Sequence, residues 1–208
     1  MNIINFIYRG SRSIVLRAWN KTSNTLAYIL MKVYLVELGN GFKSKGIPKL
    51  ILHRNGRFSI GNNFKINNTV SGNPIGRSSQ CLFRVDKGAL LQIGNNVGIS
   101  GAAIVCHQEI IISDNVKIGG NTCIYDTDFH SLDANDRNNR DKDIEHTKKE
   151  KVFIDKNVFI GAHVTILKGV IIGKNSIIGA CSVVTKNVPE NEIWAGNPAK
   201  LIKRINDN

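Results

Sequence analysis

The feature that most constrains this chain is an isoleucine or valine that recurs every six residues from about residue 93 to residue 188. The repeat falls into three blocks, and within each block the step is six residues. Its members are Ile93, Ile99, Val105, Ile112, Ile118, Ile124, Ile154, Ile160, Ile166, Ile172, Ile178 and Val184. One branched aliphatic per short period is typical of a solenoid in which each strand points one side chain inward. The pattern predicts a parallel β-helix.

A second repeat marks one corner of the predicted coil. The phrase Ile-(Gly/Ser/Asp)-x-Asn begins at Ile60, Ile93, Ile112, Ile154 and Ile172. Asn tolerates the left-handed backbone conformation that a tight corner requires. The step from Ile154 to Ile172 is 18 residues, which is three periods of six. We therefore predict triangular coils, with the strands of successive coils paired in parallel about 4.8 Å apart.

One insertion interrupts the period. The step from Ile112 to Ile154 is 42 residues, which equals one coil of 18 plus an insertion of 24. A loop of this length in a compact solenoid is usually functional or disordered. Its first residues alternate Asp126, Asp128 and His130, which would share one face of an extended chain. A neutral imidazole accepts a proton near pH 7, and a neighbouring carboxylate can fix its tautomer.

The chain divides into three parts on this basis. Residues 1–46 form a basic, amphipathic helical segment, with a helix over residues 13–38 that is broken near Lys21–Asn24. Residues 47–189 form the parallel β-helix, with the inserted loop at residues 126–150. Residues 190–208 form a C-terminal segment. We expect a short capping helix there, because Pro198 suits the first turn of a helix.

The positive charge is concentrated at the N-terminus. Residues 1–57 hold ten Lys/Arg and one acid, whereas the rest of the chain holds 18 Lys/Arg and 15 acids, out of a net charge of +12. The N-terminal segment either packs on the protein or a neighbouring subunit, or lies, over residues 1–40, on an anionic membrane surface. We expect no nucleic-acid partner, because no basic face with interleaved aromatic residues is present.

Targeting and cysteine patterns point to the cytoplasm. The N-terminus lacks the charged start, apolar run and cleavage site of a secretory signal. The apolar stretch Leu26–Leu38 is 13 residues long, too short to span a bilayer. The four cysteines (Cys81, Cys106, Cys123 and Cys181) form no CxxC pair, so neither a zinc site nor a redox motif is indicated. We expect a cytoplasmic protein, free or at the inner face of the membrane, with no metal requirement.

Four stretches carry a family resemblance: residues 126–133 (DTDFHSLD), 157–162 (NVFIGA), 177–186 (IIGACSVVTK) and 193–200 (IWAGNPAK). With the six-residue repeat, they resemble the hexapeptide-repeat acyltransferases over about residues 90–205. The similar branch contains the galactoside and maltose acetyltransferases and the O-acetyltransferases of bacterial surface polysaccharides. This resemblance implies an all-β fold, a left-handed parallel β-helix. It also implies a homotrimer with active sites between neighbouring subunits.

The same resemblance implies the site residues. It makes His130 the catalytic base. From their place in the inserted loop, we expect Asp128, or alternatively Asp126, to orient the imidazole, and Asp126, Asp133 and Arg137 to contact the acceptor. The acetyl-CoA contacts would come from Phe159, Ala162, Ala180, Thr185, Lys186, Lys200 and Lys203. Relatives often carry Trp in place of Phe159 and Arg in place of the last two lysines; Lys binds a phosphate as a point charge without the bidentate fork of Arg.

The expected function is that of an O-acetyltransferase. It would move acetyl from acetyl-CoA to a sugar hydroxyl of a bacterial surface polysaccharide or its precursor, by direct transfer in a ternary complex. One alternative is N-acetylation of an amino sugar on a nucleotide carrier. Alternatives from other classes are a non-catalytic binding solenoid and a metal-dependent protein like the γ-type carbonic anhydrases. The latter requires three converging histidines, yet no histidine lies within fifteen residues of His130.

Overall fold

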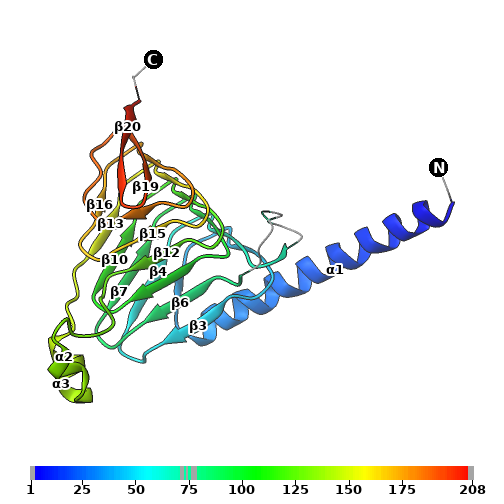
Figure 1. The fold of residues 1–208 in the computed structure, drawn as a ribbon. Coiled ribbons are helices and arrows are strands. Elements are labelled where there is room, and N and C mark those ends of the chain that lie inside the picture. Colours follow the sequence, from blue (N-terminus) through cyan, green and yellow to red (C-terminus); the bar gives the residue numbers. More distant parts are fainter. Residues whose placement is uncertain (1–2, 71–72, 74, 76–78, 206–208) are drawn as a thin grey trace.

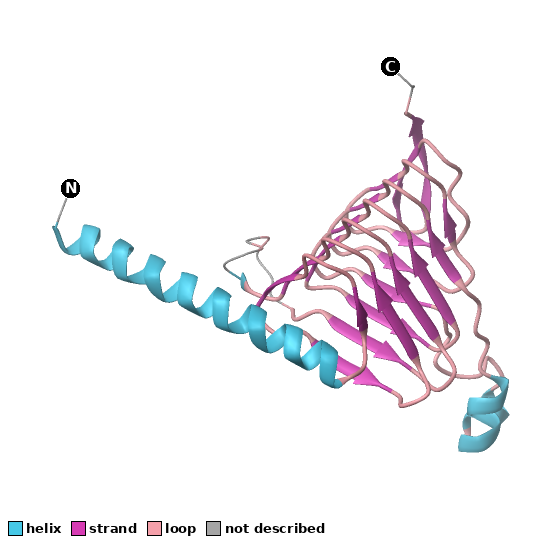
Figure 2. Ribbon diagram, turned by 180° about the vertical axis from the view of Figure 1, so that it is seen from behind, coloured by secondary structure: helices cyan, strands magenta, loops and turns pink. Residues whose placement is uncertain are grey.

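The computed structural model describes residues 3–70, 73, 75 and 79–205. One long helix, α1 (Ile3–Val33), is followed by a β-helix whose strands build three sheets, here called faces A, B and C (Figure 1). The helices α2 (Ala134–Arg137) and α3 (Arg140–His146) lie in the inserted loop. Figure 2 shows the same stack of coils from behind, with α1 crossing its wide end.

The chain visits the three faces in the order A, B, C in every coil. Face A consists of β1 (Glu37–Leu38), β4 (Arg57–Ile60), β7 (Leu90–Ile93), β10 (Glu109–Ile112), β13 (Val152–Ile154) and β16 (Ile171–Ile172). Face B consists of β2 (Lys43–Lys45), β5 (Lys65–Asn67), β8 (Gly98–Ser100), β11 (Lys117–Ile118), β14 (Phe159–Ile160), β17 (Ile177–Ile178), β19 (Glu192–Gly196) and β20 (Ala199–Arg204). Face C consists of β3 (Lys49–Leu52), β6 (Leu82–Val85), β9 (Ala103–Cys106), β12 (Cys123–Tyr125), β15 (Thr165–Ile166) and β18 (Val183–Val184). The predicted parallel β-helix is confirmed.

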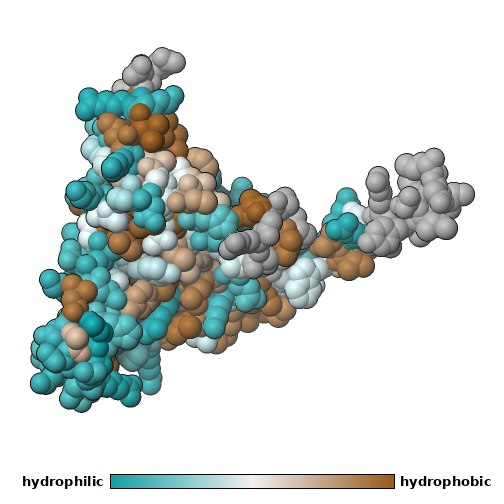
Figure 3. Space-filling view, in the orientation of Figure 1, coloured by the Kyte–Doolittle hydropathy of each residue, from teal (hydrophilic) through white to brown (hydrophobic). Residues whose placement is uncertain are grey.

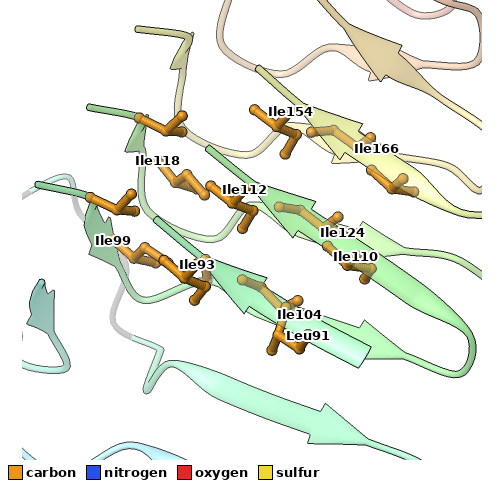
Figure 4. Packing of buried hydrophobic residues seen from close by; sticks show 14 of the residues in the cluster. Leu91, Ile93, Ile99, Ile104, Ile110, Ile112, Ile118, Ile124, Ile154 and Ile166 are labelled. Carbon is orange, nitrogen blue, oxygen red and sulfur yellow. The ribbon is translucent and has the colours of Figure 1, made fainter. Parts of the chain in front are cut away.

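The core is a stack of inward aliphatic side chains, one above another in successive coils (Figure 4). On face A, for example, Ile93 is paired in register with Ile112, and Ile112 with Ile154. One member of the predicted repeat is wrong: Val105 points outward, and Ile104 takes the inward place opposite Ile124. The reason is that β9 has two inward side chains, Ile104 and Cys106, with Val105 between them.

The coils narrow from the N-terminal to the C-terminal end. Strand β7 has four residues with Leu91 and Ile93 both buried, whereas β16 has two residues and buries only Ile172. Two inward side chains per strand need a wider triangle than one. Aromatic rings fill the extra space, since Phe58 lies 5.3 Å and Phe64 lies 6.4 Å from Phe83, measured between ring centroids. The solenoid is therefore broad near α1 and narrow near its C-terminus (Figure 1).

The Asn corner is confirmed residue by residue. All five Asn residues of the corner phrase have a left-handed φ between 57° and 62°: Asn63, Asn96, Asn115, Asn157 and Asn175. Their side chains also form a ladder in which each Nδ2 donates to the Oδ1 of an Asn in the next coil, at 2.7–3.1 Å. A corner amide thus serves its own turn and ties two coils together.

Helix α1 differs from its prediction. It runs unbroken from Ile3 to Val33, ends before residue 38, and the β-helix begins at β1 instead of residue 47. The segment expected to break bonds to the first coil instead, since Ser23 Oγ accepts from Gly46 N at 3.1 Å. Asn24 joins α1 to the first coil, because its Oδ1 accepts from the backbone N–H of Ser44 on the edge strand β2 at 2.7 Å. The second half of α1, with Ala27 and Met31 buried, therefore covers the open end of the first coil.

The C-terminal segment also differs from its prediction. The expected capping helix is a strand, β20, which pairs antiparallel with β19 at the other end of face B. An open sheet edge leaves unpaired backbone groups, and the hairpin satisfies those of β19 better than a helix does. The buried Glu192 fixes it by accepting from Trp194 Nε1 at 2.7 Å and Arg204 Nε at 3.3 Å.

Candidate functional site

The inserted loop leaves and rejoins the solenoid at the corner between faces C and A. Its two ends are tied together, because Glu150 N donates to Asp126 O at 2.9 Å and Asp128 N donates to Lys148 O at 3.0 Å. Between these ends, α2 and α3 form a largely hydrophilic lobe that projects from the body (Figures 1 and 3). The closed base positions the lobe as a unit.

Asp126 has a structural place that corrects its predicted role as an acceptor contact or histidine partner. Its side chain is fully buried and accepts from three backbone N–H groups of the preceding coil, those of His107, Gln108 and Glu109, at 2.7–2.8 Å. A carboxylate with three such donors is held tightly and has no exposed oxygen. Asp126 anchors the start of the loop.

The expected alternation of Asp126, Asp128 and His130 on one face is wrong. Phe129 adopts a left-handed φ of 65°, so the chain turns between Asp128 and His130 instead of continuing extended. Asp128 points back to the solenoid, where its Oδ1 lies 3.1 Å from Lys168 Nζ. The side chain of Asp128 therefore does not orient the imidazole of His130.

The partner of His130 is Asp143, on α3. His130 Nδ1 lies 2.7 Å from Asp143 Oδ2, and Asp143 Oδ1 accepts from Ser131 N at 2.7 Å. These hydrogen bonds hold the pKa of Asp143 below its ordinary value. The imidazole is 69% exposed, whereas the carboxyl group is 14% exposed. An accessible histidine is thus held by a sheltered carboxylate, an arrangement suited to accepting a proton.

The other predicted loop residues have partners within the lobe. Asp133 is the N-cap of α2 and accepts from Asn135 N at 2.8 Å. Arg137 Nη1 donates to the carbonyls of Ser131 and Leu132 at 2.8 and 3.0 Å. Both side chains shape the segment that carries His130, and their contact with an acceptor stays a prediction.

A second His–Asp pair lies in the same lobe. His146 Nδ1 is 2.8 Å from Asp136 Oδ2, and this bond raises the pKa of His146 and lowers that of Asp136. Asp136 also accepts from Ser131 Oγ at 3.0 Å. Neither pair was predicted, because their members are 13 and 10 residues apart and meet only when α3 folds back.

The predicted acetyl-CoA contacts on the solenoid lie on its outer surface. Phe159 projects from face B and is 49% exposed. Ala162 and Ala180 follow one another at the corner between faces B and C, beside a column of glycines. A Cβ on Gly161 would come within 2.6 Å of Ala180 N, so the chain is tightly stacked here. Ala162 and Ala180 present small side chains, and the half-buried His163 follows Ala162 in the same corner. Such a surface allows close approach of a ligand backbone.

The remaining predicted contacts lie elsewhere on the coil. Thr185 and Lys186 are exposed at the corner between faces C and A, the corner from which the loop departs. Lys200 and Lys203 are exposed on β20, at the narrow end of the solenoid. Within one chain, His130 and the pair Ala162 and Ala180 therefore belong to different corners.

Neither a metal-binding cluster nor a membrane span is found in the part of the chain that the structure describes. Over the described ranges, no group of three or more His, Cys, Asp or Glu side chains is placed to hold a metal ion. None of the helices among the described residues is long and apolar enough to cross a membrane.

Comparison with known proteins gives concordant matches. The family model for the bacterial transferase hexapeptide (six repeats) matches residues 151–186. Galactoside O-acetyltransferase of Escherichia coli is 38% identical over 121 residues, which are 58% of this chain and 57% of the relative. A mutant of AntD, an N-acyltransferase from Bacillus cereus in complex with dTDP and coenzyme A, is 25% identical with a TM-score of 0.63, covering 86% of this chain and 89% of AntD.

A galactoside acetyltransferase in complex with coenzyme A is also 25% identical, with a TM-score of 0.55, over 92% of this chain and 83% of the enzyme. The first curated relatives are matched over 47–61% of their own length. The likeness in structure extends over most of the chain and gives the fold as a left-handed parallel β-helix. With its six-residue repeat, its Asn corners and these matches, the chain is similar to the hexapeptide-repeat transferases, and residues 151–186 match that family's repeat.

Proposed function

We propose that this protein is an acetyl-CoA-dependent O-acetyltransferase that acts on a sugar hydroxyl. The observation that carries the proposal is the exposed imidazole of His130, held through Nδ1 by Asp143 at 2.7 Å. For a neutral imidazole bonded to a carboxylate, Nδ1 carries the hydrogen and Nε2 keeps its lone pair. Nε2 is therefore the atom that accepts a proton.

The reaction is a direct transfer. His130 Nε2 takes the proton of the acceptor hydroxyl as its oxygen attacks the thioester carbonyl carbon of acetyl-CoA. A carbon–oxygen bond forms, the carbon–sulfur bond breaks, and the imidazolium returns the proton to the leaving thiolate. Asp143 stabilises the imidazolium between these two transfers. General base catalysis of this kind is typically worth about 10²–10⁴-fold.

The surface of the solenoid supports binding of acetyl-CoA. The small side chains of Ala162 and Ala180 leave room for a ligand at this corner, and Phe159 lies beside it as an apolar contact for the pantetheine arm. The exposed side chains of Lys200 and Lys203 can meet the phosphates at the narrow end. Because His130 departs from another corner, we place the site between two subunits of a homotrimer, with Ala162 and Ala180 from one and His130 from its neighbour.

The base is tested by His130→Ala. We expect kcat to fall by about 10²–10⁴-fold while the Kd for CoA stays unchanged. His146→Ala is the matched control, because His146 forms the same kind of Asp pair in the same lobe. Near-wild-type turnover in His130→Ala, or an equal loss in both variants, would refute the role of His130.

An amine acceptor is the second candidate, favoured by the likeness to AntD, whose name describes an N-acyltransferase. A hydroxyl acceptor ranks first because the curated relative with 38% identity is named a galactoside O-acetyltransferase. A panel of neutral oligosaccharides and amino sugars, assayed by release of CoA thiol, separates the two. Turnover with amino sugars alone would reverse the order.

Helix α1 supports an acceptor at a membrane surface. Five apolar side chains spaced 4, 7, 3 and 4 residues apart form one exposed stripe, with basic residues beside it: Val15, Trp19, Leu26, Ile29 and Val33. We propose that residues 1–40 rest on an anionic bilayer through this stripe and that the acceptor is a lipid-linked precursor of a surface polysaccharide.

Liposome sedimentation tests the stripe. The double variant Trp19→Ser with Ile29→Ser removes two side chains that are 50% and 51% exposed and leaves the packed face of α1 intact. We expect weaker association with vesicles containing phosphatidylglycerol. The control replaces Ile51 and Ile144, which are 43% and 56% exposed on other surfaces, by Ser. Equal association of both double variants would count against the membrane role.

A further inference from the structure

A groove of about 760 Å³ lies between α1 and the outer surface of face B, at the wide end of the solenoid. Five lysines line it, and we call it the lysine groove: Lys21 from α1, Lys43 and Lys45 from β2, Lys65 from β5 and Lys117 from β11. Its other lining groups include Asn24, Asn67 and Ser100. Phe159, on β14, lies at its upper end, the end nearest the narrow, C-terminal part of the solenoid. Figures 1 and 2 both show α1 crossing the solenoid here.

The sheet register places the lysines in a column. Lys43 is paired with Lys65, Lys65 with Gly98, Gly98 with Lys117, and Lys117 with Phe159. Gly98 leaves a gap into which Lys117 folds, since a Cβ there would lie 3.4 Å from Lys117 Cδ. Lys117 Nζ then donates to Asn96 O at 3.0 Å.

The groove carries uncompensated positive charge. No Asp or Glu is among its described lining residues, and across the described chain none of these lysines is ion-paired with a carboxylate. Like charges directly opposite on neighbouring strands destabilise a sheet. An anionic ligand would offset this repulsion, and the groove's amide and hydroxyl groups suit the hydroxyls of a sugar.

The position of the groove next to the proposed acetyl-CoA site indicates what that ligand is. Its upper end reaches Phe159, beside which the proposed function places the acyl-carrying arm of acetyl-CoA. A molecule lying in the groove would thus reach the reacting centre from the side opposite Lys200 and Lys203. We propose that the lysine groove binds the acceptor and that the acceptor is an anionic glycan, one with carboxylate or phosphate groups along its chain. Naming the ligand as the acceptor rests on the proposed function; the cationic groove does not.

Equilibrium binding tests the proposal on the full-length protein. Fluorescent oligogalacturonate, which carries one carboxylate per sugar, serves as the probe, with a neutral galacto-oligosaccharide of equal length for comparison. We expect Lys43→Gln with Lys65→Gln to weaken oligogalacturonate binding about tenfold and added salt to weaken it further. Inorganic diphosphate is tested as a competitor of the probe. If it displaces the probe more strongly than unlabelled oligogalacturonate does, phosphate is the preferred group.

The control is Lys87→Gln with Lys174→Gln, which removes the same charge from exposed lysines outside the groove. Equal Kd values in the two double variants, or equal binding of the neutral glycan, would overturn the proposal. A fall in CoA affinity in Lys43→Gln with Lys65→Gln would instead assign the groove to CoA, and tighter binding of single-stranded DNA would assign it to nucleic acid. His130→Ala should keep full glycan binding. If the wild type binds the glycan yet transfers no acetyl, the proposed function fails and the groove assignment stands.

Discussion

At the scale of single residues, the pair of His130 and Asp143 is the centre of the proposed chemistry. The Asp143 carboxylate bonds to the imidazole and to Ser131 N, so we regard Asp143 as a positioning residue. Replacing it by Asn keeps the shape but removes the charge that stabilises the imidazolium. We expect kcat in Asp143→Asn to fall between about tenfold and the roughly 10⁴-fold seen for the carboxylate of a catalytic triad. The KM for acetyl-CoA should not change.

Asp136→Asn is the matched control, since Asp136 makes the same bond to His146. Similar kcat values in the two Asn variants would show that Asp143 only supports the lobe.

The lowered pKa of Asp143 also determines how the stability of the lobe depends on pH. The stabilisation from this carboxylate is fully present above its unfolded pKa and is lost as the pH falls through the lower, folded value. The contribution of this carboxylate therefore predicts faster proteolysis of the lobe on acidification.

Sequence reasoning reached His130 but not its partner. The motif around His130 is local, so a resemblance could identify it. Asp143 comes from α3 and meets His130 only because the chain turns at Phe129 and folds back, and neither event leaves a periodic signal in the sequence. The same turn explains why the alternation of Asp126, Asp128 and His130 misled: alternation places side chains on one face only while the chain stays extended.

At the scale of elements, the Asn corner can be separated into two contributions. Asn115 adopts φ 61° and its amide joins the ladder on both sides, to Asn96 and Asn157. Asn115→Gly loses the ladder bonds but accepts the left-handed backbone, whereas Asn115→Ala loses both. We expect Asn115→Ala to be less stable than Asn115→Gly by about 1 kcal/mol, measured by urea unfolding. Equal stabilities would mean that the side-chain ladder alone stabilises this corner.

The elements that sequence predicted well are those with a local repeat. The corner Asn residues predict the turns and the six-residue spacing predicts the strands, and together they predict the three-sided coil. The ends of the solenoid lack that repeat. Pro198 suggested a helix, but residues 199–204 pair with the edge of β19 as a strand. Pairing at a sheet edge depends on the fold around it and not on the local sequence. Likewise, α1 is continuous where Ser23 and Asn24 accept hydrogen bonds from the first coil, and such contacts between distant segments leave no local signal.

At the scale of the whole molecule, the arrangement of the corners supports the proposal of a site shared between subunits. Ala162 and Ala180 stand at the corner between faces B and C, while the loop with His130 leaves the corner between faces C and A. Within one chain these groups lie at different corners of the coil. The proposed chemistry needs both, so we propose that a neighbouring subunit completes each site.

Mixed trimers test this directly. His130→Ala removes the base, and Ala180→Trp fills the small-residue corner, so we expect each purified variant to be inactive. In trimers co-expressed at equal amounts, a site between two subunits receives an intact His130 from one and an intact Ala180 from the other in about one quarter of cases. Activity should therefore return to about a quarter of the wild-type value. A site contained in a single chain would give none, because every chain carries one of the two lesions.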